Sequence, residues 1–143
     1  MRTRISKQEL ELLGRVPLFS GCSQAELRDI CRLGSELEVE EGRVLTEEGA
    51  PGREFFLVIE GKADCTIGYK PVCAFGPGDY FGELALLDGG PRTATVTAGT
   101  PMRVVVLSVR EFSGLLRSSK SIAIKMLANV AGRLRSAERA VNH

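Results

Sequence analysis

A glutamate and an arginine, Glu83 and Arg92, stand in a stretch that is otherwise mostly small or apolar, "FGELALLDGGPRTATV" at residues 81–96. Charged side chains in a segment typical of a protein core need a partner, because burying an unpaired charge is costly. Two interpretations follow. The two side chains form a structural ion pair with each other, or both are kept for a ligand that carries an anionic group.

The residue types around this pair suit a phosphate with a sugar beside it. Gly82 lets a backbone N–H approach a ligand closely, and "ELALL" predicts a short helix whose first N–H groups attract an anion. The planar guanidinium of Arg92 matches two phosphate oxygens, and small residues, Ala85 and Ala94, leave room beside it. Glu83 would repel a phosphate but can accept a hydrogen bond from a sugar hydroxyl. On the residues alone, this ligand and the ion pair are about equally supported.

Most familiar catalytic arrangements are missing from the sequence. The one histidine is His143, the last residue, so a Ser-His or Cys-His couple cannot be built inside the chain. The glycines of "GPGDYFG" do not match the dinucleotide-binding pattern, and there is no Walker-type phosphate loop. No pair of acids stands in a context that favours carboxylate catalysis. We therefore expect a binding protein, not an enzyme, with no catalytic residues.

The cysteines are expected to act as small core hydrophobes. None of them forms a C-x-x-C pair, and the spacing of soft ligands that zinc needs is missing, so we expect no metal site and no cofactor. A disulfide framework is not expected without secretion. The four cysteines are Cys22, Cys31, Cys65 and Cys73.

Length and composition fit one domain over residues 1–143. The sequence is 43% hydrophobic and 26% charged with a net charge of +1, which supplies a core and gives no indication of a polyanionic partner. No apolar region of a signal peptide follows the first residues, and the runs "FFLVI" and "VVVL" are too short to span a bilayer. We expect a cytoplasmic protein with no membrane partner.

The pattern predicts helices at both ends of the chain and β-structure between them. N-terminal helices are expected at about residues 6–34, where Ser23 and Glu26 form a capping-box pattern and Gly34 ends the second helix. At about residues 35–108, short β-prone runs alternate with glycine-bearing turns. This predicts an α+β fold with an antiparallel, jelly-roll-like β-roll of about eight short strands.

Two hairpins and two C-terminal helices complete the prediction. "ADCTI" and "VCAF" flank "GYKP", and "TATVTA" and "RVVVLS" are joined by "GTPM". The helices are expected at about residues 109–141, and the longer one carries apolar residues at heptad spacing. This apolar face either packs on the roll or pairs with a second copy in a homodimer. Its residues are Ala123, Leu127, Val130, Leu134, Ala137 and Val141.

The stretch at residues 81–96 closely resembles the phosphate-binding cassette of the cyclic-nucleotide-binding domain family. That family includes the bacterial catabolite activator protein, the regulatory subunits of protein kinase A and cyclic-nucleotide-gated channels. Its pattern, F-G-E-[LI]-A-L followed by P-R-[TAS]-A-[TS]-V, is complete here. "EEGRVLTEEGAPGREFFLVIEGKADC" and "FGPGDYFGE" are similar to the strands and the turn that precede the cassette. The resemblance covers about residues 17–136.

The resemblance implies a role for each residue of the cassette. Arg92 would hold the cyclic phosphate, and Glu83 would accept a hydrogen bond from the ribose 2′-OH. Thr93 would reach the phosphate or the base, and it is compatible with cGMP as well as with cAMP, the ligand we expect. The backbone N–H groups that complete the anion site would come from Gly82, Leu84, Ala85 and Ala94.

The C-terminal helix would cover the base. In activator-like relatives a threonine and a serine of this helix contact adenine, but Ala137 and Glu138 stand at those places here. Arg133 is the candidate to stack on the purine or bond to it, and a solvent-facing arginine is the alternative. Val72 and Cys73, on the strand before the cassette, are candidates to line the base pocket.

The resemblance also implies an output through the C-terminal helices. The ligand would favour one of two helix positions, and Leu86 and Leu87 would repack against those helices. Arg133, Arg135 and Arg139 are too few to predict a DNA-binding surface, so no direct DNA binding is expected. Three interpretations remain: a stand-alone sensor that docks on an effector protein, the sensor fragment of a larger regulator or channel, and a degenerate roll that binds no nucleotide.

Overall fold

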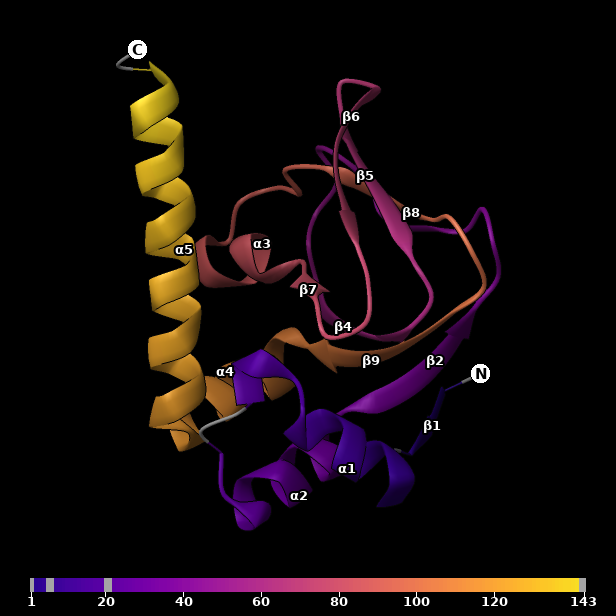
Figure 1. Ribbon diagram of the computed structural model, residues 1–143, viewed down its shortest axis with the longest axis vertical. Coiled ribbons are helices and arrows are strands. Elements are labelled where there is room, and N and C mark those ends of the chain that lie inside the picture. The colour runs from indigo at the N-terminus through magenta and orange to yellow at the C-terminus, as the bar shows by residue number, and fades with distance from the viewer. Residues whose placement is uncertain (1, 5–6, 20–21, 142–143) are drawn as a thin grey trace.

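Helices flank a β-roll in the order that the sequence predicts (Figure 1). The computed structural model describes residues 2–4, 7–19 and 22–141 of the chain. The cassette helix is α3, and it lies between the roll and the C-terminal helix. The helices are α1 (Lys7–Gly14), the 3-10 turn η1 (Pro17–Phe19), α2 (Gln24–Leu33), α3 (Glu83–Asp88), α4 (Val109–Ser118) and α5 (Lys120–Val141).

Two antiparallel sheets form the roll. One has the strand order β1-β2-β9-β4-β7 and the other has the order β3-β8-β5-β6. The strands β2 to β9 make the expected roll, and β1, which the sequence pattern does not predict, adds to the edge beside β2. The strands are β1 (Arg2–Arg4), β2 (Ser35–Val39), β3 (Val44–Thr46), β4 (Glu54–Glu60), β5 (Ala63–Ile67), β6 (Lys70–Phe75), β7 (Tyr80–Phe81), β8 (Thr95–Ala98) and β9 (Met102–Ser108).

One of the two expected hairpins forms and the other does not. Strands β5 and β6 pair around a turn at Gly68 and Tyr69, which have φ of 58° and 65°, the positive values that a tight hairpin turn requires. Strands β8 and β9 lie in different sheets, so the prediction that "GTPM" closes a hairpin was wrong. The burial of the two strands gives the reason. Strand β9 is apolar on both faces and fits the helix-covered sheet, whereas β8 alternates between buried and half-buried residues.

Strands β4 and β9, in the five-stranded sheet, are buried on both faces. On β4, Phe55 and Leu57 pack toward the helices, where Phe112 joins the same cluster, while Phe56 and Val58 belong to the cluster inside the roll. Because neither face meets water, the runs "FFLVI" and "VVVL" are continuous instead of alternating. The sheet is thereby fixed between the helices and the roll interior.

The second helix begins and ends as the sequence predicts, with a different reason at its end. The Glu26 N–H donates to the Ser23 hydroxyl at 3.1 Å, and the Ser23 N–H donates to the Glu26 carboxylate at 2.9 Å. Gly34 ends α2 with a φ of −80°, so no left-handed backbone is involved. A Cβ at this position would lie 2.8 Å from Cγ1 of Val105. The glycine therefore serves close packing of α2 on β9.

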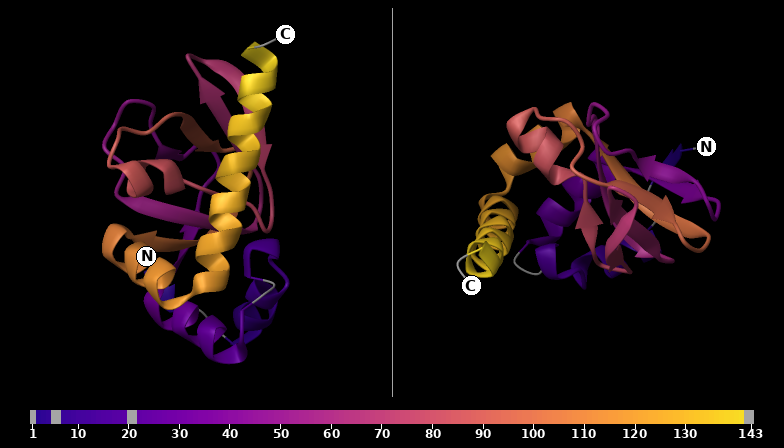
Figure 2. Two further views of the ribbon diagram at one scale, coloured as in Figure 1. Left: turned by 90° about the vertical axis from the view of Figure 1, so that its left-hand side faces the viewer. Right: turned by 90° about the horizontal axis from the view of Figure 1, so that it is seen from above.

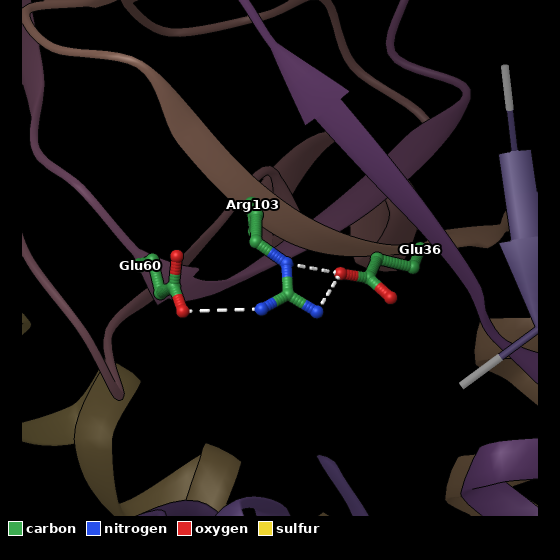
Figure 3. A network of polar contacts seen from close by, with 3 residues as sticks. All are labelled: Glu36, Glu60 and Arg103. Carbon is green, nitrogen blue, oxygen red and sulfur yellow. Dashed lines mark hydrogen bonds and ion pairs between the residues drawn. The ribbon is translucent and has the colours of Figure 1, made fainter. Parts of the chain in front are cut away.

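Arg103 of β9 joins the two neighbouring strands of its sheet (Figure 3). Its Nε and Nη2 contact the carboxylate of Glu36 on β2, and its Nη1 donates to Glu60 on β4 at 3.1 Å. Glu36 is buried, whereas the arginine is partly exposed. The arginine therefore offsets the cost of placing a carboxylate inside the fold.

The two halves of α5 have different surroundings. The helix begins beside α4 and the N-terminal helices and then runs past α3 (Figure 1, Figure 2). Ile122 and Met126 of its first half are buried, but every residue from 131 to 140 is exposed. On the expected apolar face, Leu127 and Leu134 are 68% and 60% exposed. Leu127 and Leu134 therefore do not pack on the roll, whereas Ala123 and Val130 of the same face are half-buried. The side chain of Val141 is not among those that the structure describes.

Candidate functional site

A cavity of about 210 Å³ opens between the cassette, the β5–β6 hairpin and α5. The residues around it come from segments far apart in the sequence, and the fold brings them together beside α3. Every candidate site residue that the sequence and the resemblance indicate lines this cavity. These residues are Val72, Cys73, Gly82, Glu83, Leu84, Ala85, Arg92, Thr93, Ala94 and Arg133.

Arg92 is a buried cation whose hydrogen-bond acceptors are neutral. Its Nη1 donates to the carbonyl of Gly82 at 3.1 Å, and its Nη2 donates to the carbonyl of Glu54 at 2.8 Å. The guanidinium carbon lies 6.0 Å from the centre of the Phe56 ring. Burial lowers the pKa of Arg92, and the nearby charge of Glu83 acts in the opposite direction. The guanidinium stays charged, and its two carbonyl bonds leave donors of its five-donor fork for an anion.

Two glycines make room for the Arg92 side chain. A Cβ at Gly82, whose φ is 91°, would lie 2.7 Å from Nη1 of Arg92. A Cβ at Gly52 would lie 3.1 Å from Cδ and Nε of Arg92 and 2.3 Å from Cβ of Ala85. The sequence pattern assigns Gly82 to the approach of a ligand, and the structure shows that the arginine itself also needs the space. Gly52 was missed, because nothing in "GAPGRE" tells which glycine faces the arginine.

The backbone around Arg92 is fixed by the segment that precedes β4. The Arg92 N–H donates to the carbonyl of Ala50 at 2.8 Å, and the Gly49 N–H donates to the carbonyl of Arg92 at 2.9 Å. Thr46 is buried, lines the cavity and donates from its hydroxyl to the carbonyl of Ala94 at 3.1 Å. Sequence reasoning missed Thr46, because a threonine in a β-prone run is ordinary.

Glu83 is buried at the first turn of α3, with 3% of its surface exposed. Its carboxylate forms an ion pair with Arg133 of α5, which stands 50 positions further along the chain. Within the described ranges, Glu83 and Arg92 make no ion pair with each other, so the structural pair considered for them does not form. Each of the two side chains has partners of its own.

Two polar contacts hold the middle of α5 beside the cavity. One is the ion pair of Arg133 with Glu83, which rules out a purely solvent-facing role for this arginine. In the other, Nδ2 of Asn129 donates to the hydroxyl of Tyr80 at 2.7 Å. Burial, followed by the charge of Glu83, raises the pKa of Tyr80. Asn129 and Tyr80 were missed, although Asn129 stands about one helical turn before Arg133.

A β-bulge lets two consecutive residues line the cavity. Neighbours in a regular strand point to opposite faces. Here the register passes from Thr66 opposite Pro71 to Cys65 opposite Cys73, which leaves Val72 as the extra residue of β6. Strand β6 is an edge strand, where a proline is tolerated. The bulge therefore explains why both Val72 and Cys73 reach the cavity.

The cysteines only partly follow the expectation of core hydrophobes. Cys65 is buried and Cys22 is half-buried against the helix-side core, but Cys73 is exposed, because it lies on the edge strand. The side chain of Cys31 is not among those that the structure describes.

Among the described residues, no group of three or more His, Cys, Asp or Glu side chains could hold a metal ion. In the same ranges, no helix combines the length and apolar character that crossing a membrane requires.

The chain matches the model of a known protein family. The family described as the cyclic nucleotide-binding domain matches residues 36–119. The matched segment runs from β2 through the roll and the cassette to the end of α4. It therefore contains the cavity-lining residues except Arg133 of α5.

Two curated relatives share this part of the chain. The cyclic nucleotide-gated potassium channel mll3241 of Mesorhizobium japonicum is 39% identical over 113 residues, which are 79% of this chain and 31% of the channel. The cAMP-dependent protein kinase regulatory subunit of Mycosarcoma maydis is 40% identical over 110 residues, which cover 71% of this chain and 21% of the subunit. The chain thus spans about a third or less of these relatives.

Solved structures share the fold. PKAR CBD2 with Sp-2Cl-cAMPS bound has a TM-score of 0.79 and 29% identity, and the match covers 92% of this chain and 90% of that one. The Catabolite Activator Protein of Thermus thermophilus has a TM-score of 0.82 and 27% identity, with 88% and 62% of the two chains covered. These likenesses confirm the β-roll. The four relatives are named as regulatory, activator or channel proteins and not as enzymes.

Proposed function

Because the chain belongs to the cyclic nucleotide-binding domain family, we propose that it is a sensor module that binds cAMP in preference to cGMP. The observation that carries this proposal is Arg92, a buried cation bonded to neutral carbonyls in the wall of a cavity. The choice of cAMP is supported by relatives that bind it or its analogue, PKAR CBD2 with Sp-2Cl-cAMPS and the Toxoplasma gondii PKA regulatory domain with cAMP.

The proposed ligand fits the charges of the cavity. The cyclic phosphate accepts hydrogen bonds from Arg92, and the ribose 2′-OH donates to Glu83. Arg133 occupies one carboxylate oxygen of Glu83, and a carboxylate has further lone pairs for a hydroxyl. Thr93 is exposed at the edge of the cavity, within reach of the phosphate or the base. The remaining N–H donors to the phosphate come from Gly82, Leu84, Ala85 and Ala94.

The base occupies the other end of the cavity in this proposal. Val72 and Cys73 form its wall on the hairpin side, and Arg133 covers it from α5. Arg133 then touches both the sugar acceptor and the purine. Ala137 and Glu138 are exposed, and neither of them lines the cavity.

We propose that the ligand acts by shifting the population of α5 positions. The ion pair between Arg133 and Glu83 connects α5 directly to the side chain that accepts from the ribose. On the other side of the cassette, Leu87 is 47% exposed and borders an apolar hollow of about 230 Å³ that Met126 and Leu127 also line. Movement of α5 would change the space into which Leu87 packs.

Exposed apolar residues of α5 support a homodimer, and we propose that this dimer transmits the shift in the position of α5. Ile124, Leu127 and Leu134 are each more than half exposed, and burying them against a second copy removes this apolar surface from water. Light scattering of the wild type and of Leu127→Glu and Leu134→Glu variants tests this. We expect a dimer mass that both substitutions lower. One unchanged mass for all three proteins would contradict the homodimer and favour an effector protein on this face.

We propose one regulatory domain over residues 1–143, cytoplasmic and without catalytic activity, either alone or as the sensor part of a larger regulator or channel. The net charge of +1 supports the absence of direct DNA binding by this chain, because nucleic-acid-binding domains are usually basic.

Isothermal titration with cAMP and with cGMP tests the proposed ligand. We expect binding heat with both, a lower Kd for cAMP, and no measurable binding of 5′-AMP, whose open phosphate carries a second negative charge and a different shape. No heat with either cyclic nucleotide would contradict the proposal and favour a β-roll that serves as an interaction module. Equal affinity for the two would contradict the preference alone.

A further inference from the structure

Two thiols face each other across the β5–β6 hairpin. Cys65 and Cys73 are direct partners in the antiparallel ladder. Residues opposite each other in such a ladder have Cα atoms about 4.5–5.5 Å apart, and disulfides bridge Cα separations of roughly 4.4–6.8 Å. Both residues line the same cavity, so their side chains project from the same face of the hairpin. A disulfide between them therefore requires little movement of the backbone.

The two thiols differ in access. Cys73 is exposed on the edge strand, whereas Cys65 is buried, and both line the cavity beside the cassette. Burial, followed by the neighbouring Cys73 thiol, raises the pKa of Cys65 to about 12. A small reagent from solution therefore meets Cys73 first. Cys65 is placed to react afterwards, by attacking the sulfur of Cys73 once Cys73 carries a mixed disulfide.

We propose that Cys65 and Cys73 are a reversible thiol–disulfide site whose co-reactant is a low-molecular-weight disulfide. The Cys73 thiolate attacks one sulfur of the small disulfide, and the first small thiolate leaves with the electron pair of the broken S–S bond. Cys65 then loses its proton to solvent and attacks the Cys73 sulfur, and the second small thiolate leaves. Two protein thiols are oxidised to one disulfide, and one small disulfide is reduced to two thiols.

The disulfide would change the wall of the proposed base pocket. It would fix the bulge at Val72, which lies between the paired residues Pro71 and Cys73, and it would remove two thiol hydrogens from the cavity surface. In the part of this inference that rests on the proposed function, a bound nucleotide covers the two sulfur atoms. Occupancy by the nucleotide should therefore slow the exchange.

Incubation of the full chain with glutathione disulfide tests the site. We expect an intact mass that has lost two hydrogens, a cross-linked peptide joining Cys65 to Cys73, and recovery of both thiols with dithiothreitol. The Cys65→Ser variant should stop at a stable glutathione adduct on Cys73, and Cys73→Ser should leave Cys65 unmodified. The control variant Cys22→Ser should behave like the wild type. A lasting adduct on Cys73 in the wild type, or a cross-link through Cys22, would overturn the proposal.

A second arm separates this site from the proposed function. With cAMP at about ten times its Kd, disulfide formation should slow about tenfold, because only the free protein reacts. A chain that forms the disulfide but gives no binding heat contradicts the proposed function and leaves the thiol site standing. A chain that binds cAMP but forms no disulfide overturns the thiol site alone. If saturation with cAMP leaves the rate of disulfide formation unchanged, the base does not cover the two sulfur atoms, which would contradict the assignment of Val72 and Cys73 to the base pocket.

Discussion

Two arginines of the β-roll are held in opposite ways. Arg103 lies between the carboxylates of Glu36 and Glu60 and links three strands of one sheet (Figure 3). Arg92 is buried beside the cassette and donates to backbone carbonyls, with no ion pair among the described residues. The first arginine neutralises a buried acid. The second keeps a net positive charge inside a cavity, which is what an anionic ligand needs and what stability alone does not explain.

Replacing Arg92 should have the largest effect on binding. The Arg92→Ala change would remove the two charge-assisted hydrogen bonds proposed with the phosphate, worth about 4 kcal/mol together, so the Kd for cAMP should rise roughly a thousandfold. Isothermal titration measures the change. The Arg92→Lys variant keeps the charge but loses the planar fork, so its Kd for cAMP should lie between those of the wild type and Arg92→Ala. If Arg92→Ala binds cAMP with wild-type affinity, the ligand-binding role that distinguishes Arg92 from Arg103 would be contradicted.

Replacing Arg103 should have its effect on stability instead. The Arg103→Ala change takes the guanidinium away from the buried Glu36, at a cost of about 2 kcal/mol in the free energy of unfolding after allowance for the partly exposed arginine. Urea denaturation measures this loss, and titration should show an unchanged Kd for cAMP. A loss of affinity as large as that of Arg92→Ala would mean that the two arginines have the same kind of role.

A ligand without the ribose hydroxyl sharpens the assignment of Glu83. We expect Glu83→Gln to weaken cAMP binding about tenfold, since a hydrogen bond to a charged acceptor becomes a neutral one. The wild type should lose a similar factor with 2′-deoxy-cAMP, and the variant should lose little more with that ligand. If the loss of affinity from Glu83→Gln and the loss from the missing hydroxyl multiply in full when the two changes are combined, Glu83 does not contact the hydroxyl.

The smallest expected effect is at Arg133. The arginine side chain is 53% exposed, and the buried Glu83 also interacts with the charge of Arg92, so loss of the Arg133 ion pair should cost only about 1 kcal/mol. Arg133→Ala should nevertheless speed amide hydrogen exchange in the exposed half of α5, which the pair helps to hold beside α3. Arg135→Ala, at an exposed position two residues on, is the matched control. Equal exchange in both variants would contradict a link between α5 and the cassette.

The sequence predicts the cassette better than its surroundings. Glu83 and Arg92 could be recognised because charges in an apolar run are conspicuous, and the capping box of α2 is a local pattern. Gly52 and Thr46 could not be recognised, because their importance comes from contacts with Arg92 and Ala94 that exist only in the folded chain.

The errors of prediction have the same origin. The segment "GTPM" is a plausible hairpin loop by length, but the burial of β9 on both faces takes that strand to the other sheet. The exposure of Cys73 depends on β6 being an edge strand, and sheet order is not a local property of the sequence. The partner of Glu83 proved to be Arg133, because it is the path of α5 that brings the two together.

A crystal structure of the chain with cAMP bound would show directly which side chains hold the proposed ligand. We expect the cyclic phosphate within hydrogen-bonding distance of the Arg92 guanidinium and the ribose 2′-OH on Glu83, in the cavity beside α3. A phosphate bound elsewhere, or cAMP in this cavity with its phosphate turned away from Arg92, would contradict this expectation.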